Sequence, residues 1–325
     1  MIISASRRTD IPAFFSDWFY NRIERGFVLV RNPMNTHQVS RISIRPEIVD
    51  CIVFWTKNPE YFIKRLHQIE MYRYYFQYTI TSYGKILEPN IPSLEELIEC
   101  FKRLSKTIGR KRVIWRYDPI IITDEHSINY HKEHFAMIAQ QLSEHTNKCV
   151  ISFVDFYKKT MKNMSKINYY TLLEDQIIDL TNSLKLISEK YNIVLTSCAE
   201  EIDLSKQGIM HGKCIDDKLI EEISGYSLEA EKDKNQRAEC GCIASIDIGA
   251  YNTCPHGCLY CYANYDMNQV RSNYAQHKKD SDLLYGNITK EDKITDKKVL
   301  SCKIVQKTLF DRDLPSQFMT SKVEK

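Results

Sequence analysis

Short apolar segments recur along this chain, and most of them are followed by a stretch whose hydrophobic residues have helical spacing. This alternation is typical of a parallel β-sheet whose strands are joined by crossover helices. The candidate strands are residues 2–6, 27–31, 51–56, 74–80, 112–117, 149–153, 192–198 and 242–248. Eight such units are what a closed barrel requires, so the sequence predicts an α/β fold of the (β/α)₈ TIM-barrel type.

Two of the connecting stretches carry clear helix signals. Residues 92–104 begin with Ser93 as a candidate N-cap, and residues 170–190 have apolar side chains at helical spacing. Residues 32–46 differ, because they look like an extended loop. The chain from residue 278 is polar and lysine-rich, which predicts a poorly packed tail. We therefore expect one barrel domain over residues 1–275, including a cluster loop at 240–262, and a polar C-terminal extension over 276–325.

The overall composition narrows the class of protein. With 43% hydrophobic and 27% charged residues, the chain can bury a substantial core. Its net charge of +3 indicates no dedicated nucleic-acid surface, and no segment approaches the roughly 20 apolar residues of a membrane helix. We expect a cytoplasmic protein with no membrane partner. Most of its 11 cysteines lie after residue 197, and in a reducing compartment such a concentration indicates metal binding.

Polar and charged residues follow most of the predicted strands. In a barrel the carboxyl ends of the strands meet at one face, which holds the active site in characterised barrel enzymes. The arginines and the lysine at these ends favour an anionic substrate, such as a phosphate or a carboxylate. The candidate catalytic residues are Arg7, Asp10, Lys57, Arg116, Asp118 and Glu200.

Three cysteines near the C-terminus have the spacing CxxxCxxC. Cys254, Cys258 and Cys261 lie in the segment DIGAYNTCPHGCLYCYA, directly after the last candidate strand. Thiolates this close together can ligate one face of a [4Fe–4S] cluster and leave one iron without a protein ligand. The amino and carboxylate groups of S-adenosylmethionine can chelate that open iron, so the motif predicts both cofactors.

The trio resembles the signature of radical S-adenosylmethionine enzymes, which also have an aromatic residue before the last cysteine, here Tyr260. The resemblance implies that the three cysteines ligate the cluster and that Tyr260 contacts the adenosyl group. In those enzymes the motif follows the first barrel strand, whereas here it lies near the C-terminus. If residues 242–248 close against residues 2–6, the layout is retained as a circular permutation. No glycine-rich stretch like the one that holds the methionine amine in those enzymes is found.

The chain also resembles, over nearly its full length, a bacterial family catalogued as domain of unknown function 1848. The resemblance is carried by the segments ISASRRTDIPA, VFWTKNP, WRYDP, TSCAE, CGC and CPHGCLYCYA. That family has a C-terminal cysteine cluster similar to that of the radical enzymes, which again implies an iron–sulfur site on the trio.

A second group of cysteines precedes the trio: Cys198, Cys214, Cys240 and Cys242. Four thiols can saturate either a zinc ion or an auxiliary iron–sulfur cluster such as a second [4Fe–4S] centre. The C-x-C pair is less typical of zinc than C-x₂-C, which favours iron–sulfur, although some of the four could be ordinary buried thiols. His256, inside the trio, could tune a cluster or face solvent. The remaining cysteines are expected to be structural: Cys51, Cys100, Cys149 and Cys302.

Two classes of function follow from these patterns. The first is a radical S-adenosylmethionine enzyme that acts on a small molecule and receives electrons from a donor such as a ferredoxin or flavodoxin. A variant of it is a nucleic-acid repair enzyme resembling spore photoproduct lyase, so nucleic acid stays open as a partner. The second is a non-catalytic protein in which the cysteines bind zinc or a redox cluster.

Overall fold

The computed structural model describes residues 1–155, 158–165 and 167–304. Its main element is one parallel sheet with the strand order β11-β10-β8-β6-β5-β4-β1-β12. These strands are β1 (Ile2–Ala5), β4 (Cys51–Thr56), β5 (Tyr74–Thr79), β6 (Val113–Ile120), β8 (Lys148–Phe153), β10 (Val194–Ser197), β11 (Met210–His211) and β12 (Ile246–Asp247). The predicted parallel α/β architecture is confirmed. No pairing joins the edge strands β11 and β12 in the described part of the chain, so the sheet is not a closed ring.

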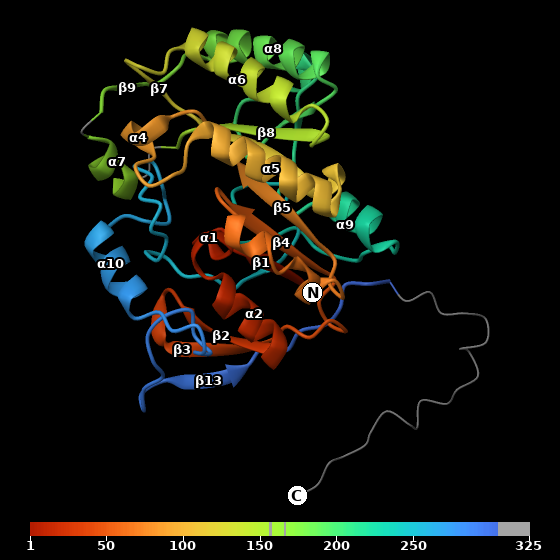
Figure 1. Cartoon of the computed structure of the whole chain (residues 1–325), viewed down its shortest axis with the longest axis vertical. Coiled ribbons are helices and arrows are strands. Elements are labelled where there is room, and N and C mark those ends of the chain that lie inside the picture. The colour runs from red at the N-terminus through yellow and green to blue at the C-terminus, as the bar shows by residue number, and fades with distance from the viewer. Residues whose placement is uncertain (156–157, 166, 305–325) are drawn as a thin grey trace, which may run out of the picture.

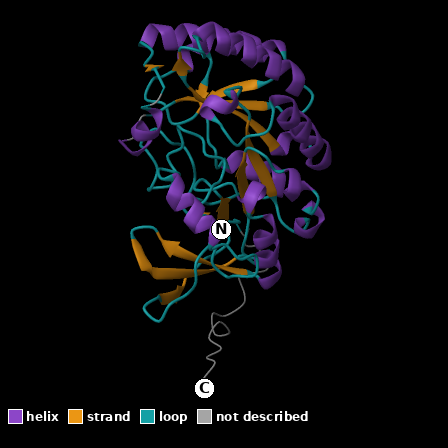
Figure 2. Cartoon of the chain, turned by 60° about the vertical axis from the view of Figure 1, so that its left-hand side comes forward, coloured by secondary structure: helices purple, strands orange, loops and turns teal. Residues whose placement is uncertain are grey.

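Most helices cover one face of this sheet, and long loops lie against the other (Figure 2), where Ile220 of helix α9 (Asp217–Ser224) is also buried. Helix α5 begins as predicted, because Ser93 caps it and Glu96 completes a capping box with the Ser93 backbone. None of the described helices is long and apolar enough to cross a membrane. The helices are α1 (Ile11–Phe14), α2 (Ser16–Arg25), α3 (Glu60–Ile63), α4 (Gly84–Leu87), α5 (Leu94–Ile108), α6 (Ile128–Leu142), α7 (Lys158–Met164), α8 (Glu174–Lys190), α9 (Asp217–Ser224) and α10 (Met267–Ala275).

The two faces of the sheet bury different side chains. Toward the helices, Phe54 and Phe76 stack with their ring centroids 4.7 Å apart within the main core. On the opposite face, Val53 and Tyr75 pack in a second apolar cluster together with Cys214 and other cysteines. The alternation of side chains along each strand thus sends one set toward the helices and the other toward the loops that carry the second group of cysteines.

A smaller sheet corrects one predicted strand. Residues 27–31 fall within β2 (Phe27–Asn32), which pairs with β3 (Asn35–Ser43) and not with the main sheet. The prediction failed because residues 32–46 form an antiparallel partner strand where a parallel unit needs a crossover helix. In the segment expected to be a poorly packed tail, β13 (Lys293–Asp296) pairs with β3, and the three strands lie together in Figure 1. A further short pair is β7 (Ile122–Thr123) with β9 (Tyr169–Tyr170).

The beginning of the chain and the segment before the trio lie side by side in the main sheet. Strand β12 pairs in parallel with β1, as expected for residues 242–248 closing against residues 2–6. The Asp247 carboxylate reinforces this pairing by accepting hydrogen bonds from Ser4 Oγ at 2.6 Å and Ser6 Oγ at 2.7 Å. Only glycine fits at position 249, because a Cβ there would lie 2.6 Å from Ser6 Cβ. The trio therefore begins just beyond a tightly held strand pair.

Candidate active site and cysteine centres

A cavity of about 940 Å³ lies at the carboxyl ends of the parallel strands. Ligand pockets of enzymes are commonly of this size. The structure brings the predicted rim together here, except for Glu200, which is not among the described residues that line the cavity. The predicted residues that line it are Arg7, Asp10, Lys57, Arg116, Asp118, Tyr260 and all seven cysteines of the two groups, Cys198, Cys214, Cys240, Cys242, Cys254, Cys258 and Cys261.

The trio lies on one continuous loop that neighbouring segments hold by backbone contacts. The Leu259 N–H donates to Leu87 O at 3.0 Å, and the Asn90 side chain donates to Pro255 O at 2.9 Å. On the other side, Asn264 Nδ2 donates to Cys254 O at 2.5 Å. Gly257 has a φ of +72°, a left-handed conformation that glycine adopts without strain. Contacts from both sides therefore define the path of the loop.

The thiols of the trio are shielded from solvent. Cys254 and Cys258 are buried, and Cys261 is half-buried. Burial raises the pKa of all three thiols above the ordinary value. Because thiolates, and not thiols, bind iron, a cation entering this loop would displace the protons. The donor chemistry of the trio thus fits the soft-ligand set of an iron–sulfur cluster.

Asp10 anchors the trio loop to the N-terminal part of the chain. Its Oδ2 lies 2.9 Å from His256 Nε2 and accepts from the Lys57 N–H at 2.7 Å. Its Oδ1 accepts from the Ala13 N–H at 3.0 Å and caps α1. His256 is buried, so it does not face solvent, and its Nδ1 has no hydrogen-bond partner in the structure. Asp10 is therefore a positioning residue for the loop.

A buried charged network lies beside the trio, and sequence reasoning missed its central residue, Glu88. Its Oε1 accepts from Lys57 Nζ at 2.7 Å, from Thr81 Oγ1 at 2.8 Å and from the Tyr260 hydroxyl. Burial opposes ionisation, but the Lys57 ammonium outweighs it and lowers the pKa of Glu88. Glu88 follows a short helix and not a strand, so the strand-end pattern did not point to it. The network fixes Tyr260 and Lys57 against the trio.

Two arginines line the cavity near the second group of cysteines. Arg116 is paired with Asp118, and its Nη1 donates to Cys214 Sγ at 2.8 Å. Arg7 lies over the Trp55 ring, 5.1 Å from its centroid, and its Nη1 is 3.7 Å from the Asp233 carboxylate. The Nη2 of Arg7 is buried without a hydrogen-bond partner. A buried donor of this kind is an available contact for an anion in the cavity.

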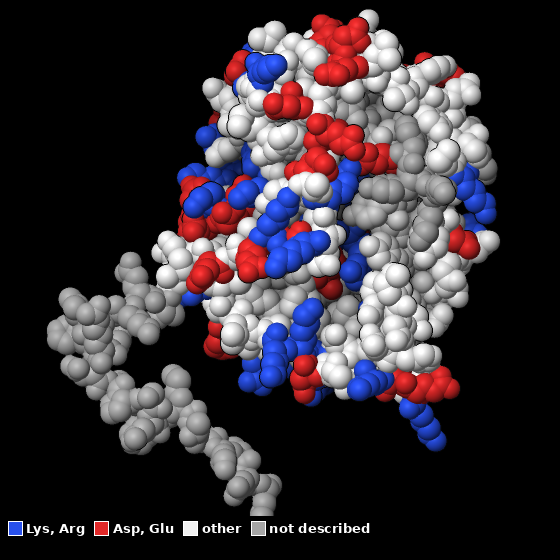
Figure 3. Space-filling view, turned by 180° about the vertical axis from the view of Figure 1, so that it is seen from behind, with Lys and Arg blue, Asp and Glu red and all other residues white. Residues whose placement is uncertain are grey.

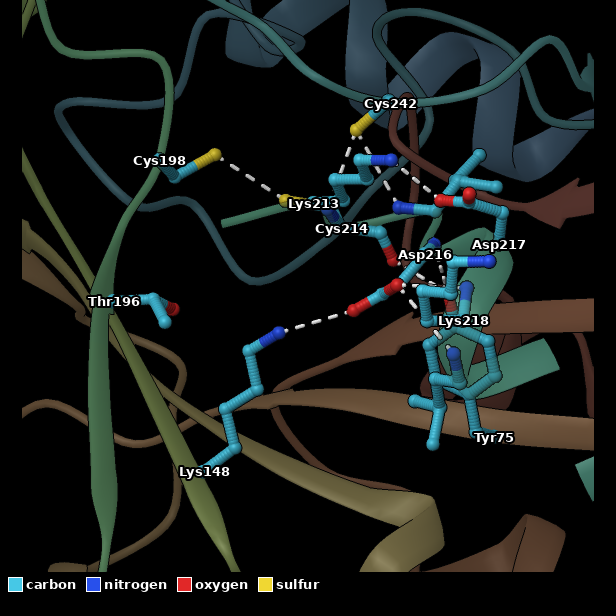
Figure 4. A network of polar contacts seen from close by, with 12 residues as sticks. Tyr75, Lys148, Thr196, Cys198, Lys213, Cys214, Asp216, Asp217, Lys218 and Cys242 are labelled. Atoms are coloured by element: carbon cyan, nitrogen blue, oxygen red, sulfur yellow. Dashed lines mark hydrogen bonds and ion pairs between the residues drawn. The ribbon is translucent and has the colours of Figure 1, made fainter. Parts of the chain in front are cut away.

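The second group of cysteines is assembled from three separate segments (Figure 4). Cys198 Sγ lies 3.2 Å from Cys214 Sγ, and the Cys214 N–H donates to Cys242 Sγ at 3.2 Å. Cys240 lies two residues from Cys242 and interacts with it through its thiol. Gly212 allows the chain after β11 to lie close to β10, since a Cβ at that position would lie 2.7 Å from Thr196 Oγ1. This close packing brings Cys214 near Cys198. Sulfurs distant in sequence thus become neighbours.

Glu200 lies behind the cavity wall. Its Oε1 accepts a hydrogen bond from the Phe153 N–H at 2.9 Å, so the carboxylate joins the loop after β10 to the end of β8. Burial, together with the charges of Asp155 and Asp118, raises the pKa of Glu200 to about 7. The geometry gives Glu200 a supporting contact with a residue that lines the cavity.

The arrangement of the sulfurs is not that of a single ion's ligands. Among the residues that the structure describes, no three His, Cys, Asp or Glu side chains surround one point as a mononuclear site requires. In tetrahedral zinc sites the Zn–S bonds are about 2.3 Å long, which holds the sulfurs evenly around one centre. Centres of several irons distribute their ligands over a larger volume.

The face of the molecule in Figure 3 carries charges of both signs. Lys and Arg are interspersed with Asp and Glu across it. A surface that binds nucleic acid through its phosphates gathers basic side chains into a continuous patch or stripe. This face does not have that pattern.

The comparisons with known proteins agree with the sequence resemblance at the level of the family. A family model described as domain of unknown function (DUF1848) matches residues 2–263. The matched range includes both groups of cysteines and all the strands of the main sheet. No curated protein and no solved structure matches the chain significantly.

Proposed function

The chain belongs to the DUF1848 family, and we propose that it is an iron–sulfur enzyme of the radical S-adenosylmethionine type. Cys254, Cys258 and Cys261 would hold a [4Fe–4S] cluster in the wall of the cavity. When bound, the cluster supplies the electron that cleaves S-adenosylmethionine and yields a 5′-deoxyadenosyl radical able to remove hydrogen from a substrate.

The observation that carries this proposal is the position of the trio. Three shielded thiols with CxxxCxxC spacing line the same cavity as a charged rim built by the strands of the parallel sheet. A purely structural metal site has no need of an adjacent cavity or of a buried arginine nitrogen without a hydrogen-bond partner, such as Arg7 Nη2. The pairing of β12 with β1 also supports the circular permutation, since the trio then follows a strand beside β1.

The residues of the chain would divide the remaining tasks. Tyr260, held by Glu88, would present its ring to the adenosyl group. Lys57, held by the same carboxylate, places a positive charge beside Cys258. Arg7 offers its free Nη2 to an anionic group of the substrate, which favours a phosphate or carboxylate. An electron donor of the ferredoxin or flavodoxin type would complete the system.

The test is an anaerobic preparation reconstituted with iron and sulfide. Iron and sulfide per chain are measured first, and the protein is then incubated with dithionite and S-adenosylmethionine while 5′-deoxyadenosine is quantified. We expect bound iron and sulfide and a product that depends on both reagents. A chain that holds only zinc and forms no product would show instead a non-catalytic metal protein.

The ligand assignment is tested by the triple variant Cys254→Ala, Cys258→Ala, Cys261→Ala. We expect at least a 100-fold loss of 5′-deoxyadenosine, because the cluster loses all its protein ligands. The matched control is Cys302→Ala, which removes a half-buried thiol outside the cavity. Far-UV circular dichroism checks that both variants fold. Full iron content in the triple variant would refute the assignment.

A further inference from the structure

We propose that Cys198, Cys214, Cys240 and Cys242, hereafter the quartet, hold a second metal centre of iron–sulfur type in the wall of the same cavity. The inference does not depend on the chemistry proposed for the trio. It rests on four observations about the quartet: the convergence of its sulfurs, their hydrogen bonds, the cations that face them and the rigidity of their support.

The convergence is a product of the fold. Cys198 directly follows β10, Cys214 follows β11, and the Cys240 and Cys242 pair precedes β12. These segments come together on the loop-covered face of the sheet, where all but the half-buried Cys198 are buried. Four soft donors that meet beside a cavity provide a complete ligand set for an iron–sulfur cluster.

Backbone amides are directed at one of the sulfurs. Cys242 Sγ accepts from the Cys214 N–H at 3.2 Å and from the Ile215 N–H at 3.4 Å (Figure 4). Two successive amides that point at one atom form a concave site for negative charge. A neutral thiol gains little from such donors, whereas a metal-bound thiolate is stabilised by them.

Positive charge faces the quartet from two strands. Arg116 comes from β6, and its Nη1 donates to Cys214 Sγ at 2.8 Å. Arg7, beyond the end of β1, lines the same cavity as the four cysteines. Buried cations are costly unless negative charge balances them. Asp118 and Asp233 each pair with one of these arginines, and metal-bound thiolates of the quartet would lie within reach of the same positive charges.

The central segment of the quartet is held rigidly. Cys214 O accepts from the Tyr75 hydroxyl at 2.6 Å and from Gln77 Nε2 at 2.9 Å, both on β5. The Asp216 carboxylate caps α9 and lies 3.1 Å from Lys148 Nζ. Metal sites depend on such supporting contacts, because they fix the ligands before binding.

The spacing of the quartet favours iron–sulfur over zinc. The C-x-C pair of Cys240 and Cys242 is less typical of zinc sites than C-x₂-C. The quartet lines a cavity of about 940 Å³, which has room for a centre of several irons.

The experiment compares metal content among three proteins: the wild type, the trio triple variant and the double variant Cys198→Ser, Cys214→Ser. Each is reconstituted anaerobically with iron and sulfide, and iron, sulfide and zinc per chain are measured. We expect the wild type to hold more iron than either variant, and the trio variant to retain iron with iron–sulfur absorption. Combining all five substitutions should remove nearly all of the iron.

The outcomes that overturn the proposal are distinct from a failure at the trio. Wild-type iron content in the quartet variant would show that these thiols bind none of it. If the trio variant contains no iron and no sulfide, the quartet likewise binds no iron–sulfur centre. One zinc per chain at the quartet would overturn the iron–sulfur assignment. The control is Cys100→Ala, which removes a buried thiol on α5 outside the cavity and should leave metal content unchanged.

Arg116 provides a second readout, because it acts on the quartet as a positioning residue. In Arg116→Gln a positive charge next to Cys214 is lost, so we expect the midpoint potential of the second centre to become more negative. Arg116→Lys should shift that potential less, since it keeps the charge. An unchanged potential in Arg116→Gln would contradict the placement of the centre beside this side chain.

Discussion

The trio and the quartet line one cavity but are built in different ways. The trio lies on a single loop of eight residues, 254–261, and is shaped by contacts to that loop's own backbone. The quartet is gathered from three segments spread over residues 198–242 and is held by side chains of β5. The comparison shows that one group of thiols is assembled locally, whereas the other depends on the main sheet. A disturbance of the fold should therefore affect the two groups unequally.

The largest expected effect concerns the charged network of the trio. In Glu88→Ala the Lys57 ammonium stays buried without its partner, which should lower the free energy of unfolding by about 3–5 kcal/mol. Urea unfolding followed by circular dichroism measures this change. Iron at the trio should fall as well, while iron at the quartet stays bound.

The control for this prediction is Glu99→Ala. Glu99 pairs with Lys102 on the exposed surface of α5, where water screens the pair, so its loss should leave the unfolding free energy almost unchanged. If the two variants lose the same unfolding free energy, Glu88 does not stabilise a buried charge on Lys57. A quartet depleted of iron in Glu88→Ala would mean that the two groups are coupled.

A smaller effect is expected on the quartet side. Tyr75→Phe removes the hydroxyl that donates to Cys214 O and accepts from the Asp216 N–H, which should cost about 1–3 kcal/mol of stability. Because this hydroxyl holds the central segment of the quartet, iron bound there should decrease. Iron analysis of the variant in the background of the trio triple variant measures that decrease directly.

Tyr78→Phe is the matched control for this effect. Tyr78 is an equally buried tyrosine on the same strand, but its hydroxyl donates to Leu97 O at 3.2 Å, on the side of α5. It should lose comparable stability and keep all of its iron. If both variants lose iron to the same extent, the effect belongs to general stability and not to the support of Cys214.

The smallest expected effect comes from Lys148→Met. The ion pair between Lys148 and Asp216 is partly exposed to solvent, at 22% and 16% of the two side chains, so screening by water limits its contribution to about 1 kcal/mol or less. Thermal unfolding should shift only slightly, and metal content should stay the same. A loss of iron as large as in Tyr75→Phe would reveal a tighter link between α9 and the quartet than the hydrogen bonds indicate.

Much of the main sheet could be predicted from local patterns. Strand β4 is a nearly continuous apolar run and β5 is an aromatic run interrupted by Gln77, which is the pattern that burial on both faces of a parallel sheet favours. The strand-end rule likewise predicted that Arg7, Lys57 and Arg116 would meet at one cavity. Spacing alone singled out the trio as a candidate site because its cysteines are near one another in the sequence.

The features that escaped prediction depend on tertiary context. Strand β11 is only two residues long, and β2 reads like any buried strand although its partner is a hairpin neighbour. Glu88 gains its role through contacts with Lys57 and Tyr260, residues 31 and 172 positions away. These contacts cannot be predicted from any short segment of the sequence, because they form only when the loops pack together.

The pairing of β12 with β1 has a consequence for the order in which the molecule is made. One edge of β1 pairs with β4 within the first quarter of the chain, but its other edge waits for residues 246–247 to leave the ribosome. Until then that edge is open to pairing with other strands. The trio lies still later in the chain, so its thiols reach the cavity after the rest of the rim is in place. Cluster loading at the trio would then be a late event in the maturation of the protein.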